Sequence, residues 1–128
     1  MSLQHLIDGI IKQQQKDRAS TQMTLGQFID RLSQLPSDSE VVAFESPHSF
    51  RGYYCDLAFE PIGGKMTVSK ALEFARSAMG EIFEGYKGGE YQMGRNTPIW
   101  LAFEGSSNNA QQILAVNDDG TFSTKLAE

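Results

Sequence analysis

Cysteine and histidine are scarce in this chain of 128 residues, which holds one cysteine and two histidines. Because a single cysteine, Cys55, cannot form a disulfide within the chain, a reducing intracellular compartment is favoured. Long hydrophobic runs are also lacking, and none approaches the roughly 20 residues that a membrane-spanning helix needs. Residues 1–15 contain no basic stretch followed by a continuous apolar one, so we expect neither a secretory signal nor a membrane partner.

Positive charge is in the minority. Lysine and arginine total 11 against 16 aspartates and glutamates, which gives a formal net charge of −5 and a pI near 5.0. A protein that binds long nucleic acids needs clustered cations to neutralise phosphates. This composition therefore argues against a nucleic-acid partner of that kind.

Familiar catalytic motifs are missing from the sequence: it contains no Walker loop, dinucleotide-binding fingerprint or nucleophile elbow. His48 and Cys55 could form a nucleophile pair, but Cys55 alternates in phase with apolar residues and is expected to face the core. His5 lies beside the apolar face of the first predicted helix, and a metal site needs three or four convergent ligands. We therefore predict a protein that is not an enzyme and has no cofactor or metal.

The length fits one domain with an appendage. We predict an amphipathic helical arm over residues 1–21 and a single ligand-binding domain over residues 22–128. The apolar positions of the arm follow helical spacing and stop early: Leu3, Leu6, Ile7, Ile10 and Ile11. Because an isolated helix this short is marginal in water, the arm is expected to pack either on its own domain or on a second copy of the chain.

Two helices are predicted inside the domain. Thr24 is followed three residues later by Gln27, which is the capping-box pattern and places a helix over residues 25–34, before Pro36. A second helix is predicted to open at Thr67 and to end near Gly80. The remaining chain predicts about six short strands, and the sum is an α+β fold with an antiparallel, sandwich-like sheet core.

The expected strands are bounded by turn-forming residues. The segment 46–49, with Pro47, is predicted to be a turn, and the second strand is predicted to end at Pro61, Gly63 and Gly64. The strand segments are residues 40–45, 53–60, 97–103, 113–116 and 121–125.

Glycine, aromatic and cationic residues concentrate in a few loops, and these predict ligand binding. Residues 83–91 hold three aromatics, three glycines and a lysine, and residues 50–54 place Arg51 among aromatics beside a glycine. Rings can stack a base, glycine backbone amides can approach a ligand, and arginine suits phosphate. The alternative is a tight turn with aromatics in the core and a solvated loop arginine. Arg95 is a third loop cation.

The blocks that contain these loops resemble those of a group of small phage and prophage proteins, the first-described family of Thoeris anti-defence sponges. The resemblance rests on residues 49–60, 83–91 and 97–100, in this order, after a helix-forming segment that opens at Met23. It covers roughly residues 23–103. It implies a β-sandwich-like core with amino-terminal helices, acting in the cytoplasm of an infected bacterial host.

The resemblance also implies a function and a site. Members of the family bind cyclic ADP-ribose-type signals, and in some cases cyclic oligonucleotides, without cleaving them, and they assemble as dimers or larger oligomers. By block matching, Arg51 would contact phosphate or ribose, Phe83 or Tyr86 would stack a base, and Asp118 or Asn117 would accept hydrogen bonds from ribose. The complete set of expected binding residues is Arg51, Phe83, Tyr86, Lys87, Gly88, Gly89, Arg95 and Asp118.

Two other functions remain open at this point. The chain could be a small phage inhibitor that binds a host defence protein directly, for which an acidic surface would suit nucleic-acid mimicry. Acidic residues are, however, interleaved with lysines and arginines rather than gathered in one run. It could also be an accessory phage protein without a ligand.

Overall fold

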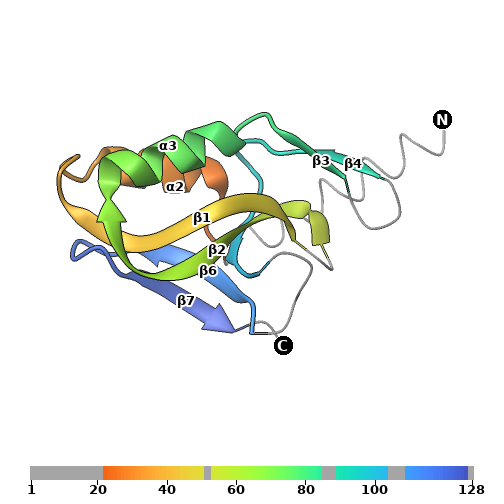
Figure 1. The fold of residues 1–128 in the computed structure, drawn as a ribbon. Helices are drawn as coiled ribbons and strands as arrows, with labels where there is room; N and C mark the ends of the chain where they lie inside the picture. The colour runs from red at the N-terminus through yellow and green to blue at the C-terminus, as the bar shows by residue number, and fades with distance from the viewer. Residues whose placement is uncertain (1–21, 51–52, 85–88, 104–108, 127–128) are drawn as a thin grey trace.

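The computed structural model describes residues 22–50, 53–84, 89–103 and 109–126. These residues form an α+β fold with a sheet core, which confirms the predicted class (Figure 1). A five-stranded sheet packs against two helices, and a two-stranded ribbon projects from one end. The predicted arm, residues 1–21, lies outside the described residues.

The elements follow in a simple order along the chain. They are α2 (Leu25–Ser33), β1 (Glu40–Phe50), β2 (Tyr53–Thr67), α3 (Val68–Ala78), β3 (Ile82–Glu84), β4 (Glu90–Gln92), β5 (Ile99–Leu101), β6 (Gln111–Val116) and β7 (Phe122–Leu126). The large sheet has the order β1-β2-β5-β6-β7, and β3 pairs with β4 alone.

Local sequence signals fix both helix starts. At α2 the Thr24 hydroxyl accepts the Gln27 backbone N–H at 3.3 Å, and the Gln27 side chain accepts the Thr24 N–H at 3.0 Å, so the predicted capping box is formed. At α3 the Thr67 hydroxyl accepts the Lys70 N–H at 3.2 Å. Each cap satisfies backbone donors that a helix start would otherwise leave unpaired.

One strand pair corrects the antiparallel prediction. β2 and β5 run parallel, with Leu57 opposite Ile99 and Phe59 opposite Leu101, while the other pairs are antiparallel. A parallel pair needs a long crossover connection, and α3 with the β3–β4 ribbon supplies it.

The first hairpin is longer than predicted because β1 continues through the segment assigned to a turn. β1 lies at the edge of the sheet, where the missing N–H of Pro47 breaks no ladder hydrogen bond. Ser46 adopts a positive φ of 51°, and the pairing register shifts between Glu45 and His48. The chain therefore forms a β-bulge there and not a turn.

β2 likewise continues past its predicted end at Pro61. Gly63 and Gly64 have φ values of 76° and 74°, and the register jumps between Val42 opposite Lys65 and Phe44 opposite Pro61. Glycine adopts these values without steric cost, so the extra residues form a bulge and pairing resumes up to Thr67.

The sheet curls, so its two edge strands approach each other across the core. The rings of Phe44 in β1 and Phe122 in β7 have centroids 6.1 Å apart, although these strands lie at opposite ends of the strand order. The Val42 N–H also donates to the Gly120 carbonyl at 2.9 Å. Helix α2 covers the open side, and Phe28 reaches both Phe44 and Phe122 at 5.6 and 5.7 Å.

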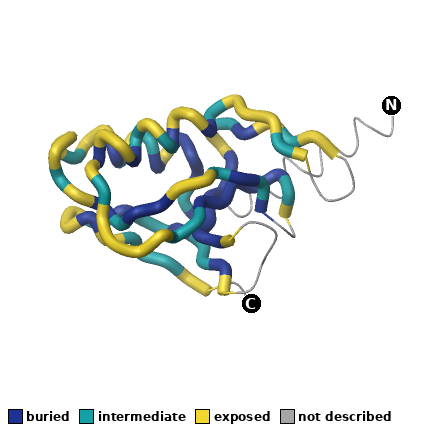
Figure 2. Tube along the Cα trace, viewed as in Figure 1, coloured by how far each residue is buried: buried dark blue, intermediate teal, exposed yellow. Residues whose placement is uncertain are grey.

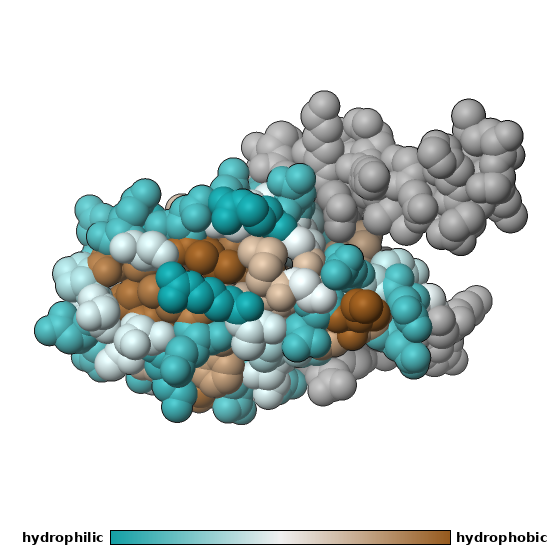
Figure 3. Space-filling model, turned by 90° about the horizontal axis from the view of Figure 1, so that it is seen from above, coloured by the Kyte–Doolittle hydropathy of each residue, from teal (hydrophilic) through white to brown (hydrophobic). Residues whose placement is uncertain are grey.

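Buried residues concentrate in the strands and on the inner faces of the two helices (Figure 2). The view onto the helix side shows apolar side chains bordered by hydrophilic ones (Figure 3). Helices α2 and α3 carry hydrophobic residues that stay only partly buried, among them Ile29 and Leu72.

Candidate functional site

The three sequence blocks that carry the family resemblance, residues 49–60, 83–91 and 97–100, are linked by contacts between aromatic rings. Phe50 and Tyr53 are paired where β1 leads into β2, and Trp100 comes from β5. Tyr91, from β4 in the ribbon, stacks on Tyr54 of β2 with centroids 6.4 Å apart. Aromatic side chains from segments far apart in the sequence therefore surround the first residues of β2.

Three of these rings lie nearly parallel. Phe50 stacks on Trp100 with centroids 4.1 Å apart and planes 5° apart. Tyr53 lies 6.4 Å from each of them, with its plane tilted by no more than 14°. Phe50 and Trp100 are 3% and 2% exposed, whereas Tyr53 is 44% exposed. The stack is thus buried except at Tyr53, where a flat ring could add to it.

The ring stack lies on the sheet face opposite the helices. Leu57 and Phe59 of β2 belong to the main core, while Ala58 between them belongs to a second cluster with Phe50 and Trp100. The small side chains Ala102 and Ala110 complete this second cluster. β2 is therefore buried on both faces over this stretch.

A buried carboxylate lies under the rings. Asp56 is 0% exposed, and its Oδ2 accepts a hydrogen bond from Trp100 Nε1 at 2.9 Å. The thiol of Cys55 donates to Oδ1 of the same carboxylate at 3.6 Å. Burial of Cys55 confirms its predicted place away from solvent. Asp56 was not among the residues predicted to matter, because the alternating pattern of this strand indicates a core-facing row at Cys55, Leu57 and Phe59 and gives no sign that the row of Asp56 is buried too.

The side chain of His48 contacts backbone carbonyl groups in this region. Its Nδ1 lies 3.0 Å from the Ser49 carbonyl oxygen and its Nε2 lies 3.0 Å from the Ala102 carbonyl oxygen. Both ring nitrogens thus face main-chain acceptors, and the ring ties the edge strand β1 to the chain that follows β5. This placement does not make His48 a general base for Cys55.

Of the residues predicted to bind ligand, Phe83 lies in β3 and Gly89 directly precedes β4. Phe83 is partly buried and packs against the main core. Gly89 lies beside the Tyr91 ring, and a Cβ built there would stand 2.9 Å from the tyrosine oxygen. The predicted residues Arg51, Tyr86, Lys87 and Gly88 lie outside the described residues.

Arg95 is paired with helix α2. Its Nη2 donates to Asp30 Oδ2 at 2.6 Å, and its carbonyl oxygen accepts the Gly26 N–H at 3.0 Å. A Cβ at Gly26 would stand 2.9 Å from the Arg95 backbone oxygen, so glycine allows this close approach. The cation of Arg95 therefore already has a carboxylate partner within the chain.

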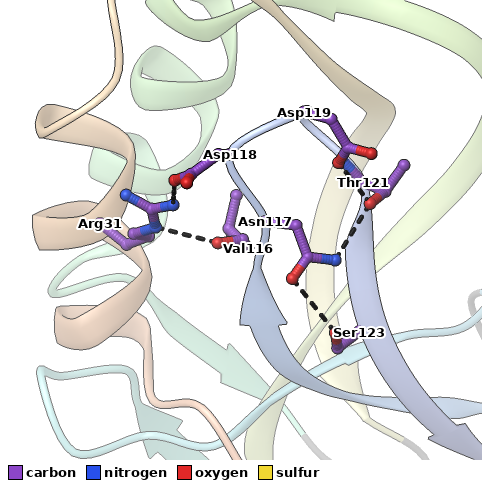
Figure 4. A network of polar contacts seen from close by, with 7 residues as sticks. All are labelled: Arg31, Val116, Asn117, Asp118, Asp119, Thr121 and Ser123. Atoms are coloured by element: carbon purple, nitrogen blue, oxygen red, sulfur yellow. Dashed lines mark hydrogen bonds and ion pairs between the residues drawn. The ribbon is translucent and has the colours of Figure 1, made fainter.

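Asp118 is also paired with α2 (Figure 4). It accepts a hydrogen bond from Arg31 Nη2, while Arg31 Nε donates to the Val116 carbonyl at 2.9 Å. Asn117 contacts Thr121 in the same turn and Ser123 at the start of β7. The Arg31 contacts join the β6–β7 turn to α2, and the Asn117 contacts hold the turn itself, so both Asp118 and Asn117 stabilise the fold.

The same turn predicts a pH effect on stability. Hydrogen bonds from the Thr121 hydroxyl at 2.6 Å and the Thr121 N–H at 3.0 Å lower the pKa of Asp119 below its ordinary value. Because the folded-state pKa lies below the unfolded-state one, the stabilisation is complete above about pH 3.9 and is lost as the pH falls through the folded-state pKa.

We expect Asp119→Asn to reduce the free energy of unfolding at neutral pH and to converge with the unaltered protein at low pH. Urea unfolding between neutral pH and about pH 2 measures this difference. Thr121→Val should reproduce the effect and Thr121→Ser, which keeps the hydroxyl, should not. A difference that stays constant with pH would contradict the assignment.

None of the helices in the described part of the chain has the length and apolar content to cross a membrane. The same residues contain no group of three or more histidine, cysteine or acidic side chains placed to hold a metal ion. No protein-family model matches the chain, and neither a characterised protein nor a solved structure matches it significantly.

Proposed function

We propose that this protein is a viral anti-defence sponge, which binds and sequesters a cyclic ADP-ribose-type or cyclic oligonucleotide immune signal without cleaving it. The observation that carries the proposal is the three-ring stack that Phe50 and Tyr53 form with Trp100, next to the Tyr54–Tyr91 ring pair that brings in the third sequence block. In that stack Tyr53 remains 44% exposed beside two buried, parallel rings.

The chemistry of such a signal fits Tyr53 and the cationic residues that lie near these blocks in the sequence. A base is flat and gains about 1–3 kcal/mol from stacking on an aromatic side chain. Arg51 directly precedes Gly52 and Tyr53 in the sequence, and Lys87 comes after the β3 segment and before the β4 segment in the sequence. A guanidinium and an ammonium group are the side chains that suit phosphates.

Sequestration of a ligand requires fewer functional groups than its chemical conversion does. It requires affinity for the ground state of the ligand and no group that stabilises a transition state. In the proposal, copies of the chain act in the cytoplasm of the infected host cell and assemble into a dimer or a larger oligomer through residues 1–21.

The test is capture and release. The purified protein is incubated with cyclic ADP-ribose, separated from free ligand, heated to unfold it, and the released small molecules are identified by mass spectrometry. We expect stoichiometric release of the intact molecule. A chemically changed product would indicate an enzyme, and an absence of bound ligand from both cyclic ADP-ribose and an extract of signalling cells would overturn the proposal and favour a protein-binding inhibitor.

A further inference from the structure

The carboxylate of Asp56 lies where an apolar side chain would be expected. It is 0% exposed, on a sheet face that it shares with Phe50, Ala58 and Trp100. Removing a carboxylate from water is costly even when it is hydrogen-bonded, and an apolar residue of similar volume is often as stable or more so. Packing alone therefore does not explain an aspartate at this position.

The hydrogen bond between Asp56 and Trp100 restricts the orientation of the indole ring. Trp100 lies opposite Ala58 in the parallel β2–β5 pair. The contact between Nε1 and Asp56 Oδ2 at 2.9 Å selects one orientation of the indole plane. Phe50 then stacks on that plane at 4.1 Å, so the carboxylate sets the direction of both buried rings.

Tyr53 is the member of this stack that solvent reaches. Its ring is parallel to Phe50 within 10° and to Trp100 within 14°. Phe83, in contrast, is partly buried against the main core. A flat ring that enters from solvent therefore meets an oriented aromatic surface at Tyr53.

We propose that Tyr53 is a stacking subsite for the planar base of the ligand, and that Asp56 is a positioning residue which orients this surface through Trp100. This inference rests on the proposed function and deepens it, because it names the part of the ligand that is recognised and the side chain that meets it. Asp56 itself does not touch the ligand.

The single tryptophan of the chain makes the subsite observable. With cyclic ADP-ribose as the probe, Trp100 emission should change on titration, and calorimetry should give the affinity. Ribose 5-phosphate, which carries the phosphate but no base, should leave the emission unchanged. Tyr53→Ala should weaken binding of cyclic ADP-ribose about ten- to a hundredfold, the range supplied by stacking on one ring.

The role of Asp56 is tested by two substitutions and a matched control. Asp56→Leu, similar in size but without an acceptor, should shift the emission of Trp100 and weaken probe binding about tenfold or more, whereas Asp56→Asn, which keeps an oxygen acceptor, should restore affinity to within about threefold. Ile62→Ala, a half-exposed residue of the β2 bulge, should change neither. If Asp56→Leu does not fold, Trp100→Phe keeps a ring while removing the N–H donor and should show the same loss.

The outcomes separate the two proposals. If the unaltered protein binds cyclic ADP-ribose and Tyr53→Ala binds it equally well, the base lies elsewhere and only the subsite is overturned. Unchanged affinity in a folded Asp56→Leu or Trp100→Phe protein overturns the positioning role. If the unaltered protein captures no cyclic ADP-ribose and nothing from a signalling extract, both the proposed function and the subsite fail.

Discussion

Substitution of Gly120 by alanine is expected to lower the free energy of unfolding by about 3 kcal/mol or more. Gly120 has a φ of +87°, which an alanine adopts only with strain, and an added Cβ would stand 2.1 Å from the Glu40 carbonyl oxygen. The atoms that this Cβ would meet belong to the backbone of Glu40 and Val41, so no side-chain rotation relieves the clash. The change would also displace the Gly120 carbonyl that accepts the Val42 N–H.

A matched control separates strain from collision. Gly80 has a similar φ of +82°, but a Cβ there would meet nothing within 4 Å. Gly80→Ala should therefore cost only about 1–2 kcal/mol, the ordinary cost of the left-handed conformation. Urea unfolding of both variants measures the difference, and equal losses would show that the contact with Glu40 is not decisive.

Truncation of Phe44 to alanine should cost about 3–5 kcal/mol, the range for a large buried aromatic residue. The ring is fully buried and is the meeting point of the aromatic core. It contacts the rings of Phe28, Phe59, Phe74 and Phe122 at centroid distances of 5.6, 4.7, 6.1 and 6.1 Å. Its loss would open a cavity between both edge strands and both helices.

Phe103→Ala is the control for this second substitution, because Phe103 is 57% exposed. Its removal should change the free energy of unfolding by no more than about 0.5 kcal/mol. Chemical denaturation of the two variants under identical conditions gives the comparison. A loss at Phe44 of similar size to that at Phe103 would contradict the central position of the Phe44 ring.

Helices could be predicted from the sequence because their signals are local. The capping box at Thr24 and Gln27 involves residues three apart, and the cap at Thr67 does the same for α3. Such contacts form within one turn of chain, whatever the remainder of the molecule does. Both starts therefore agree with the structure.

Strand boundaries were harder to predict because they depend on neighbours that are distant in sequence. Pro47 would end a central strand, but β1 lies at the edge, and only the sheet order reveals this. The same holds for β2, whose bulge at Gly63 and Gly64 looked like a chain reversal. The parallel direction of β5 likewise follows from the path of the chain through α3.

The contacts around the candidate site could be predicted in part. The sequence indicated that its aromatic blocks would come together, and Tyr54 meets Tyr91 while Phe50 meets Trp100. The role of Asp56 could not be predicted, because an alternating strand usually has one face in solvent. In this structure a second buried cluster, which contains Phe50 and Trp100, covers the other face of β2 as well. The ion pairs of Arg95 with Asp30 and of Asp118 with Arg31 could not be predicted either, because each joins a loop to a helix that is distant in the sequence.

The approach of β1 to the β6–β7 turn has a consequence for how the chain reaches its native state. The Val42–Gly120 hydrogen bond and the Phe44–Phe122 contact join residues near opposite ends of the described domain. Contacts of such high sequence separation raise the relative contact order and slow folding, because loop-closure entropy is lost before they can form. We therefore expect the contacts between β1 and the β6–β7 hairpin to form late in folding, after the locally capped helices and the first hairpin.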